Sequence, residues 1–190
     1  MRTFKKLVVV MAVLVLSAVG AANASAAEFT STAEGVLHGE AEETQVFTIN
    51  NGTIECEAID FTGGKTDLAG TSQHATVEYT ECVAFGVADV HISPATYLFT
   101  ANGEVHIEDP ITIEVTVPLG LDCHVTVGPQ TVATVDYSSA SGKLTLDPTI
   151  SGIEYTTTGN MFWCGTGGTN GTYTGASIVE LTGGELAFDA

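Results

Sequence analysis

Basic residues are scarce in this sequence. Three of the five lie within the first six residues, and only Lys65 and Lys143 follow Ala27, where all 23 acidic residues lie. The chain after Ala27 therefore has 21 uncompensated negative charges, 23 acidic residues less two lysines. Because binding of nucleic acid depends on lysine and arginine contacts to phosphates, this composition excludes a nucleic acid as partner.

Motifs of catalysis are missing as well. The sequence has no G-x-S-x-G elbow, which holds a serine nucleophile in acyl transfer, and no C-x-x-C pair. The Gly-rich segment 165–171 contains no lysine and opens no helical pattern, so it does not predict a phosphate-binding loop. We therefore expect no enzyme. The alternative is a carbohydrate-active hydrolase, which needs only two carboxylates facing each other across a cleft.

Only one long apolar run occurs, at the amino terminus. Residues 7–19 form an apolar run that only Ser17 interrupts, two lysines stand just before it, and mostly small residues occupy 20–27. This is the order of regions in a secretory signal peptide, and the run is shorter than the roughly 20 residues that a spanning helix needs. We predict a signal-peptide helix at 1–26, cleavage after Ala26, no stable membrane insertion afterwards, and a secreted, extracellular or cell-envelope location.

The cysteines are few, and their number is even. Cys56, Cys82, Cys123 and Cys164 are the four cysteines, and all lie after the predicted signal peptide. In an exported chain this predicts disulfide bonds rather than thiol chemistry. Of the three pairings that four cysteines allow, we favour Cys56 with Cys82 and Cys123 with Cys164, because each pair closes a moderate loop and leaves two sequential units.

Alternation of apolar and polar residues dominates the rest of the chain. In residues 111–117 four aliphatic side chains share one face of a strand, and Cys123, Val125 and Val127 repeat that phase. Further alternating segments are separated by Gly, Asn, Pro and Asp at roughly 8 to 12 residue intervals. The pattern predicts an all-β fold, an antiparallel sandwich or barrel, of which we favour a β-sandwich with Greek-key or jelly-roll-like connections.

The length of the exported part suits a single domain, since about 164 residues follow Ala26. Residues 27–43 are polar and contain glycine. We expect them to form a polar leader into one β-sandwich domain at 44–190. Asn51-Gly52 and Asn102-Gly103 each stand between two alternating runs, which is typical of β-hairpin turns.

A metal site is the best candidate for a binding function. Asp89 and His91 alternate with apolar residues in one predicted strand, and Glu104 and His106 do so in another. If the two strands pair as a hairpin, imidazoles and carboxylates share one polar face, where they can bind Zn²⁺ or another divalent cation. A solvated face that carries two histidines explains the same pattern. We expect no other cofactor.

The spacing of cysteines and aromatic residues resembles a family of secreted, uncharacterised actinobacterial proteins. The segments that carry the resemblance are residues 56–61, Tyr79 to Cys82 with Phe85-Gly86, residues 123–130, and Cys164 with residues 172–175. The resemblance implies a secreted β-rich protein, and it implies no activity, substrate or catalytic residue.

These observations together predict a secreted or envelope-associated β domain without catalytic function. We expect it to act as an extracellular binding or structural module, with an extracellular or cell-surface ligand whose identity the sequence does not give. The alternatives are a carbohydrate-active enzyme and a divalent-cation-binding module.

Overall fold

The computed structural model describes residues 26–65, 67–86, 88–116, 122–159 and 164–190. Most of these residues lie in β-strands, and every strand pairing is antiparallel. The predicted all-β, antiparallel class is therefore confirmed. No helix in the described part of the chain is long and apolar enough to cross a membrane. Apart from Ala26, the predicted signal peptide lies outside the described residues.

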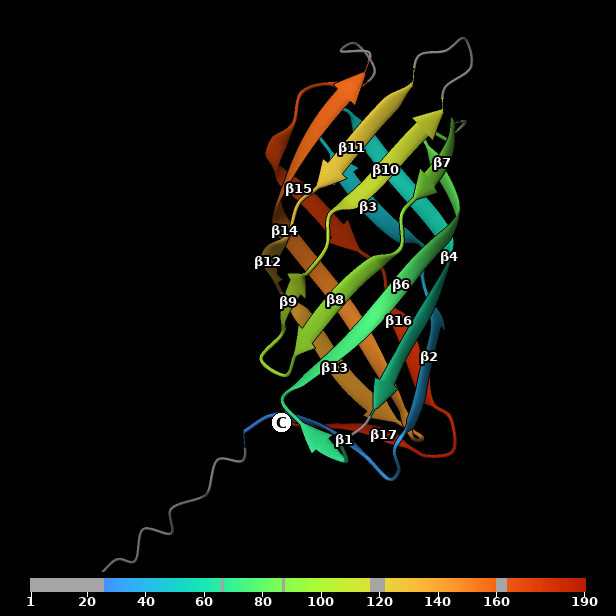
Figure 1. Cartoon of the computed structure of the whole chain (residues 1–190), viewed down its shortest axis with the longest axis vertical. Helices are drawn as coiled ribbons and strands as arrows, with labels where there is room; N and C mark the ends of the chain where they lie inside the picture. The colour runs from blue at the N-terminus through green and yellow to red at the C-terminus, as the bar shows by residue number, and fades with distance from the viewer. Residues whose placement is uncertain (1–25, 66, 87, 117–121, 160–163) are drawn as a thin grey trace, which may run out of the picture.

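Three strands are much longer than the others and extend through both halves of the molecule (Figure 1). They are β4 (Gly52–Lys65), β6 (Ser72–Ala84) and β14 (Lys143–Gly159). At about 3.3 Å per residue, the 17 residues of β14 span roughly 55 Å along the strand. The shorter strands pair with one half or the other of these three, so that the long strands join the two halves.

In the upper half of Figure 1 the ladders form a closed ring. Five strands complete it: β3 (Gln45–Ile49), β7 (Ala88–Ile92), β10 (Ile111–Thr116), β11 (Cys123–Val127) and β15 (Gly168–Thr174). Hydrogen-bonded pairs lead from β4 through β3, β15, β14, β11, β10, β7 and β6 back to β4. The wall of strands is thus continuous here.

In the lower half a second set of short strands assembles on the same three long strands. They are β2 (Gly35–Ala41), β8 (Ala95–Thr100), β9 (Glu104–Ile107), β12 (Gln130–Ala133), β13 (Val135–Ala140) and β16 (Ser177–Leu181). Ladders lead from β14 through β16, β2, β4, β6, β8 and β9 to β12. No ladder joins β12 to β14, although β13 pairs with β14.

The gap between β12 and β14 is closed by one side chain. The amide nitrogen of Gln130 donates to the carbonyl of Glu154 at 2.8 Å, and its amide oxygen accepts from the backbone N–H of Glu154 at 2.9 Å. The Gln130 side chain thus supplies the two hydrogen bonds that a neighbouring backbone residue would otherwise make. It completes the lower circuit of strands.

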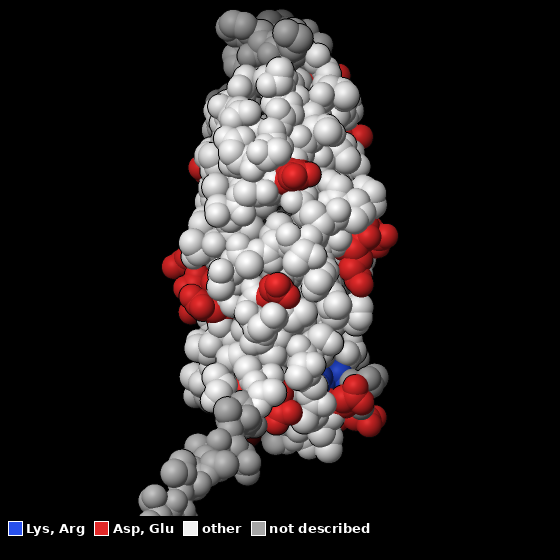
Figure 2. Space-filling view, turned by 90° about the vertical axis from the view of Figure 1, so that its left-hand side faces the viewer, with Lys and Arg blue, Asp and Glu red and all other residues white. Residues whose placement is uncertain are grey.

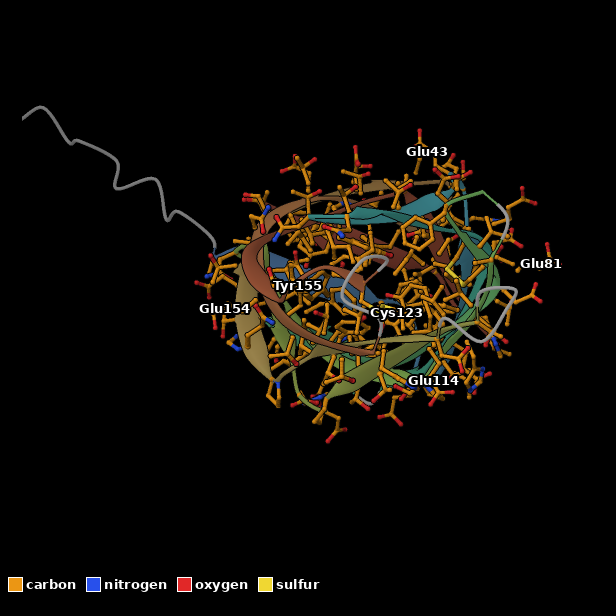
Figure 3. The ribbon with its side chains drawn as sticks, turned by 90° about the horizontal axis from the view of Figure 1, so that it is seen from above. Glu43, Glu81, Glu114, Cys123, Glu154 and Tyr155 are labelled. Carbon is orange, nitrogen blue, oxygen red and sulfur yellow. A yellow bond between two sulfur atoms is a disulfide. The ribbon has the colours of Figure 1, made fainter. Side chains whose placement is uncertain are left out.

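Seen from above, the strands surround an interior that side chains fill (Figure 3). Glu43, Glu81, Glu114 and Glu154 point away from this interior, and Cys123 and Tyr155 lie inside it. Apolar residues on the inner phase of every long strand form one continuous core. The alternation in the sequence thus separates a solvated outer surface from an apolar interior.

Irregularities keep apolar residues inside where strict alternation would turn them outward. In β6, Val77 is buried on the inner phase, and so is Cys82, five positions further on. Glu81 lies between them with a φ of 54°, which marks an irregular residue in the strand. In β14 the register shifts between Ser151 and Ile153, around Gly152 with a φ of 79°. In both strands the apolar residues beyond the irregular residue take the other alternation phase and still point inward.

The segment 27–43 is not a leader. It forms β1 (Glu28–Ser31) and β2, and β2 pairs with both β4 and β16 in the wall. At the lower end β1 lies between β5 (Ala69–Gly70) and β17 (Leu186–Asp189) in a small separate sheet. The ring of Phe29 in β1 packs edge-on against Tyr137 of β13, with ring centroids 5.0 Å apart. The small sheet thereby covers the lower end of the core.

The structure brings together the two cysteine pairs that the sequence favours. Cys56 in β4 and Cys82 in β6 are direct cross-strand partners with Cα atoms 4.0 Å apart. Cys123 at the start of β11 pairs with Cys164, which precedes β15, at a Cα separation of 5.4 Å. Both pairs lie in the upper half, so each cross-link reinforces the closed ring there.

The Gln130 clamp makes a testable prediction. Replacing Gln130 with Ala leaves the backbone N–H and carbonyl of Glu154 without these partners, so we expect the free energy of unfolding to fall by about 1–3 kcal/mol. Urea unfolding measures this change, and hydrogen exchange at the Glu154 amide should accelerate. Gln73→Ala is the matched control, because the Gln73 amide bonds to Gly64 and His74 on strands that already share a ladder. Equal losses in both variants would contradict the role of Gln130.

Candidate functional site

The predicted metal-binding hairpin does not form. Asp89 and His91 lie in β7, which pairs with β6 and β10, whereas Glu104 and His106 lie in β9, which pairs with β8 and β12. The two strands are not neighbours, so the four residues do not share one face. Among the residues that the structure describes, no group of three His, Cys, Asp or Glu side chains is placed to hold a metal ion.

His91 instead has Glu114 of β10 as its cross-strand partner. Glu114 is also the direct partner of His124 in β11, and the Nδ1 atom of His124 lies 3.8 Å from its carboxylate oxygen. Both members of this pair are exposed, and exposed ion pairs contribute little to stability. His106 accepts or donates one hydrogen bond with the Thr131 hydroxyl at 2.9 Å. The two predicted histidines therefore belong to separate surface contacts.

The face shown in Figure 2 carries acidic side chains in several places among uncharged ones. Some acidic residues are direct cross-strand partners, as Glu28 is of Asp189 and Asp136 is of Asp147. A longer row runs across three adjacent strands, where Glu40 is directly opposite Asp60, and Asp60 is directly opposite Glu78. Carboxylates directly opposite each other on one face repel and destabilise a sheet. Charge repulsion along this row therefore lowers the stability of the folded state. Burial of the core and pairing of the strands more than compensate for that loss.

The interior holds a central cavity of ≈ 100 Å³. It lies where the upper and lower circuits meet, because residues of both circuits line it. Its wall is mostly aliphatic and aromatic and includes Ile54 and Val77 of the long strands, Ile113 of the upper ring, and Val105 and Val132 of the lower circuit. No charged residue lines it among those that the structure describes. This composition suits an uncharged, apolar guest.

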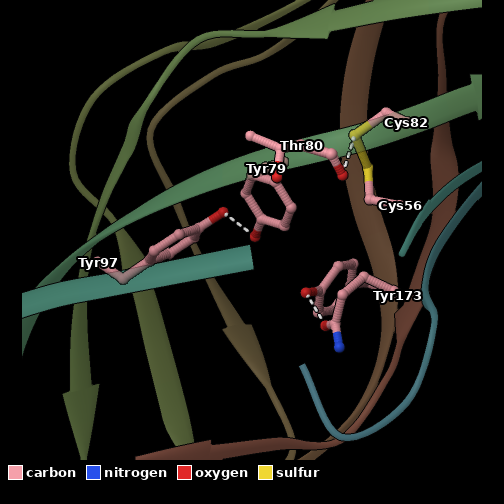
Figure 4. The surroundings of a disulfide bond; sticks show 7 residues. Cys56, Tyr79, Thr80, Cys82, Tyr97 and Tyr173 are labelled. Carbon is pink, nitrogen blue, oxygen red and sulfur yellow. Dashed lines mark hydrogen bonds between the residues drawn. A yellow bond between two sulfur atoms is a disulfide. The ribbon is translucent and has the colours of Figure 1, made fainter. Parts of the chain in front are cut away.

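A buried polar chain interrupts the apolar wall on one side (Figure 4). The hydroxyl groups of Tyr79 in β6 and Tyr97 in β8 lie 2.9 Å apart, and Tyr173 in β15 donates a hydrogen bond to the side-chain oxygen of Gln45. The rings of Tyr79 and Tyr173 meet edge to face, with their centroids 6.4 Å apart. These two hydrogen-bonded pairs, with the ring contact between them, make up the polar chain along the cavity.

Burial sets the protonation of this chain. Removal from water raises the pKa of Tyr79, and it raises the pKa of Tyr97 and Tyr173 well above the ordinary range. The three hydroxyl groups therefore stay neutral and keep their hydrogens throughout the ordinary pH range. They act as hydrogen-bonding groups and not as proton acceptors.

Sequence reasoning missed these residues, although a signal for them exists. Tyr79 continues the inner phase of Ala75 and Val77, and Gln45 begins the inner phase of Phe47 and Ile49. A polar tip on the apolar phase of a strand must find a partner inside the fold, because an unpaired buried polar group is costly. A polar residue at a strand position that points into the core is therefore a better marker of an internal site than a charged residue at a position that points to solvent.

Comparison with models of protein families found no match, and searches of curated proteins and of solved structures found none either. The resemblance to secreted actinobacterial proteins therefore stays a prediction, and the function is argued from the cavity and its polar chain.

Charge repulsion on the outer surface is testable with Asp60→Asn. Removing the central charge of the row from Glu40 to Glu78 should raise the midpoint of thermal unfolding by about 1–2 °C at low ionic strength. The gain should fade in 1 M salt, where the screening length is about 3 Å. Glu34→Gln, in the turn before β2, controls for the general loss of negative charge. An equal gain in the control would show that the row itself has no effect.

The buried tyrosines predict sensitivity to alkali. Their pKa values are raised above the ordinary 10.0, so the folded protein holds these protons to higher pH than the unfolded chain. This contribution to stability is complete below about pH 10 and is lost as the pH rises above it. Phenolate absorbance from these residues should appear together with unfolding, whereas urea-unfolded protein should titrate near pH 10. Their gradual ionisation near pH 10 with the near-ultraviolet circular dichroism unchanged would contradict burial of the chain.

Proposed function

We propose that this chain is a secreted, extracellular domain without catalytic function that binds a small, uncharged, largely apolar molecule in its central cavity. The observation that carries the proposal is the cavity of ≈ 100 Å³, lined mostly by apolar side chains and bordered by the neutral hydroxyl groups of Tyr79, Tyr97 and Tyr173. The predicted signal peptide and the two cysteine pairs support export, since disulfide bonds persist in oxidising compartments.

An apolar guest gains from this cavity in two ways. It leaves water, and it supplies contacts that the lining atoms lack while the space is empty. A charged guest would lose its hydration without finding an opposite charge in the lining, which carries a high cost. An apolar cavity of roughly 150 Å³ binds benzene, so this smaller cavity admits at most a molecule with a single ring.

The polar chain favours binding over catalysis. General acid–base catalysis works best when the pKa of the group lies near the operating pH, whereas burial raises the pKa of Tyr97 and Tyr173 well above it. The hydroxyl groups can therefore orient a guest but do not take its proton. The carboxylates of the row Glu40, Asp60 and Glu78 lie on the opposite, solvated face of the wall.

Benzene is the first probe for this function. We expect it to bind the folded protein and to raise the midpoint of thermal unfolding in a concentration-dependent way, because a ligand that binds only the folded state stabilises it. Val105→Phe should abolish the shift, since the larger ring at this lining position fills the cavity.

Val36→Phe is the matched control for this experiment. Val36 lies in β2 with 49% of its surface exposed, so the same substitution there leaves the cavity open and should keep the benzene shift. Absence of a shift in the unsubstituted protein, or an undiminished shift in Val105→Phe, would contradict binding in the cavity.

A further inference from the structure

Gln45 uses the one hydroxyl hydrogen of Tyr173. The amide nitrogen of Gln45 donates to the carbonyl of Glu43 at 2.8 Å and to the carbonyl of Ala176 at 3.0 Å, which occupies both amide hydrogens. The amide oxygen can only accept, so the Tyr173 hydroxyl donates to it. Tyr173 therefore has no hydrogen left for a guest, although it lines the cavity.

The pair of Tyr79 and Tyr97 differs, because two hydroxyl groups share a single hydrogen bond. Their oxygen atoms lie 2.9 Å apart, and either hydroxyl can be the donor. Whichever hydroxyl donates, the other keeps its own hydrogen. No other hydrogen bond joins either hydroxyl to the part of the chain that the structure describes. The pair thus has one spare hydrogen, and this count is the same for both directions of the bond.

The spare hydrogen lies at the cavity. Tyr79 and Tyr97 both line it, among residues that are mostly aliphatic or aromatic. A buried donor without an acceptor raises the free energy of a protein, and it is a rarer defect than an oxygen lone pair that stays unused. An oxygen atom of a guest can accept this hydrogen without breaking the bond between the two tyrosines or the bond between Tyr173 and Gln45.

From this count, and resting on the proposed function, we infer that the guest carries an uncharged oxygen acceptor: it is a compact ketone, ether or alcohol whose oxygen accepts the spare hydrogen of the Tyr79–Tyr97 pair. The apolar body of the guest packs against the aliphatic part of the lining, which includes Val105 and Ile113. A hydrocarbon of the same size fits the same space but leaves the hydrogen unused. Binding involves no covalent step.

Cyclopentanone and methylenecyclopentane test this inference, because they differ only in an oxygen atom in place of a CH₂ group. The ratio of their two dissociation constants is compared between variants, so that the different hydration of the two probes cancels. Replacing Tyr79 and Tyr97 together with Phe removes the spare hydrogen and keeps both rings. We expect this double variant to lose about three- to tenfold in its relative preference for cyclopentanone, as one hydrogen bond implies. An unchanged ratio would overturn the inference.

The single variants Tyr79→Phe and Tyr97→Phe test the count itself. Each leaves one hydroxyl group, whose hydrogen then has no tyrosine partner, so one spare hydrogen remains. We therefore expect each single variant to keep the ratio of the unsubstituted protein. If both single variants lowered the ratio as far as the double variant does, the two hydroxyl groups would act only as an intact pair, and the count would be wrong.

Tyr173→Phe is the matched control, because it removes a hydroxyl group from the same lining without removing a spare hydrogen. It should keep the ratio of the unsubstituted protein. A ratio that falls in Tyr173→Phe and not in the double variant would show that the guest does not use the Tyr79–Tyr97 pair.

Infrared spectroscopy of the unsubstituted protein tests the same contact without a variant, and it decides alone if the double variant does not fold. A hydrogen bond lowers the stretching frequency of a carbonyl group, so bound cyclopentanone should absorb at a lower frequency than it does in hexane. A carbonyl band at the hexane position would overturn the inference. If benzene binds while the band and the ratio stay unchanged, only the inference about the oxygen acceptor fails, whereas failure of benzene and both probes to bind removes the proposed function as well.

Discussion

The ladder between β4 and β6 is the pairing on which the rest of the structure depends. It extends from the partners Ile54 and Ala84 to Thr62 and Thr76, and both the upper ring and the lower circuit pass through it. A break in this ladder would open both circuits at once and expose the cavity that lies between them. The Cys56–Cys82 pair links the same two strands, so the covalent cross-link reinforces the pairing that the enclosure needs most.

The sequence predicts the strands well and their closure poorly. Alternation places Ile113 and Val125 inside correctly, because a half-buried strand shows its environment in its own residues. Closure of the wall depends on which distant strands pair, and no local pattern carries that information. The segment 27–43 looked like a leader because β2 alternates small and polar residues, and Gly39 must lie close to Phe61 and Val179, where a larger side chain would not fit.

The candidate site illustrates the same limit on local patterns. The metal hypothesis needed β7 and β9 to be neighbours, but β7 pairs in the upper ring and β9 in the lower circuit, so Asp89 and Glu104 separate. The irregular residue Glu81 also hides the inner phase of β6, because alternation counted from Tyr79 would turn Cys82 outward. A register shift of one residue exchanges the two faces of a strand, so the lining of a cavity follows from the assembled ladders and not from each strand alone.

The polar chain in the cavity is better suited to recognition than to support. A network built only for stability would best use every donor and every acceptor, because a buried polar group without a partner is costly. Here both amide hydrogens of Gln45 are used and its oxygen accepts from Tyr173, whereas Tyr79 and Tyr97 bond to each other in the lining of the cavity. Because a hydroxyl oxygen has two acceptor lone pairs, the Tyr79–Tyr97 pair keeps the capacity to accept a hydrogen bond from a guest.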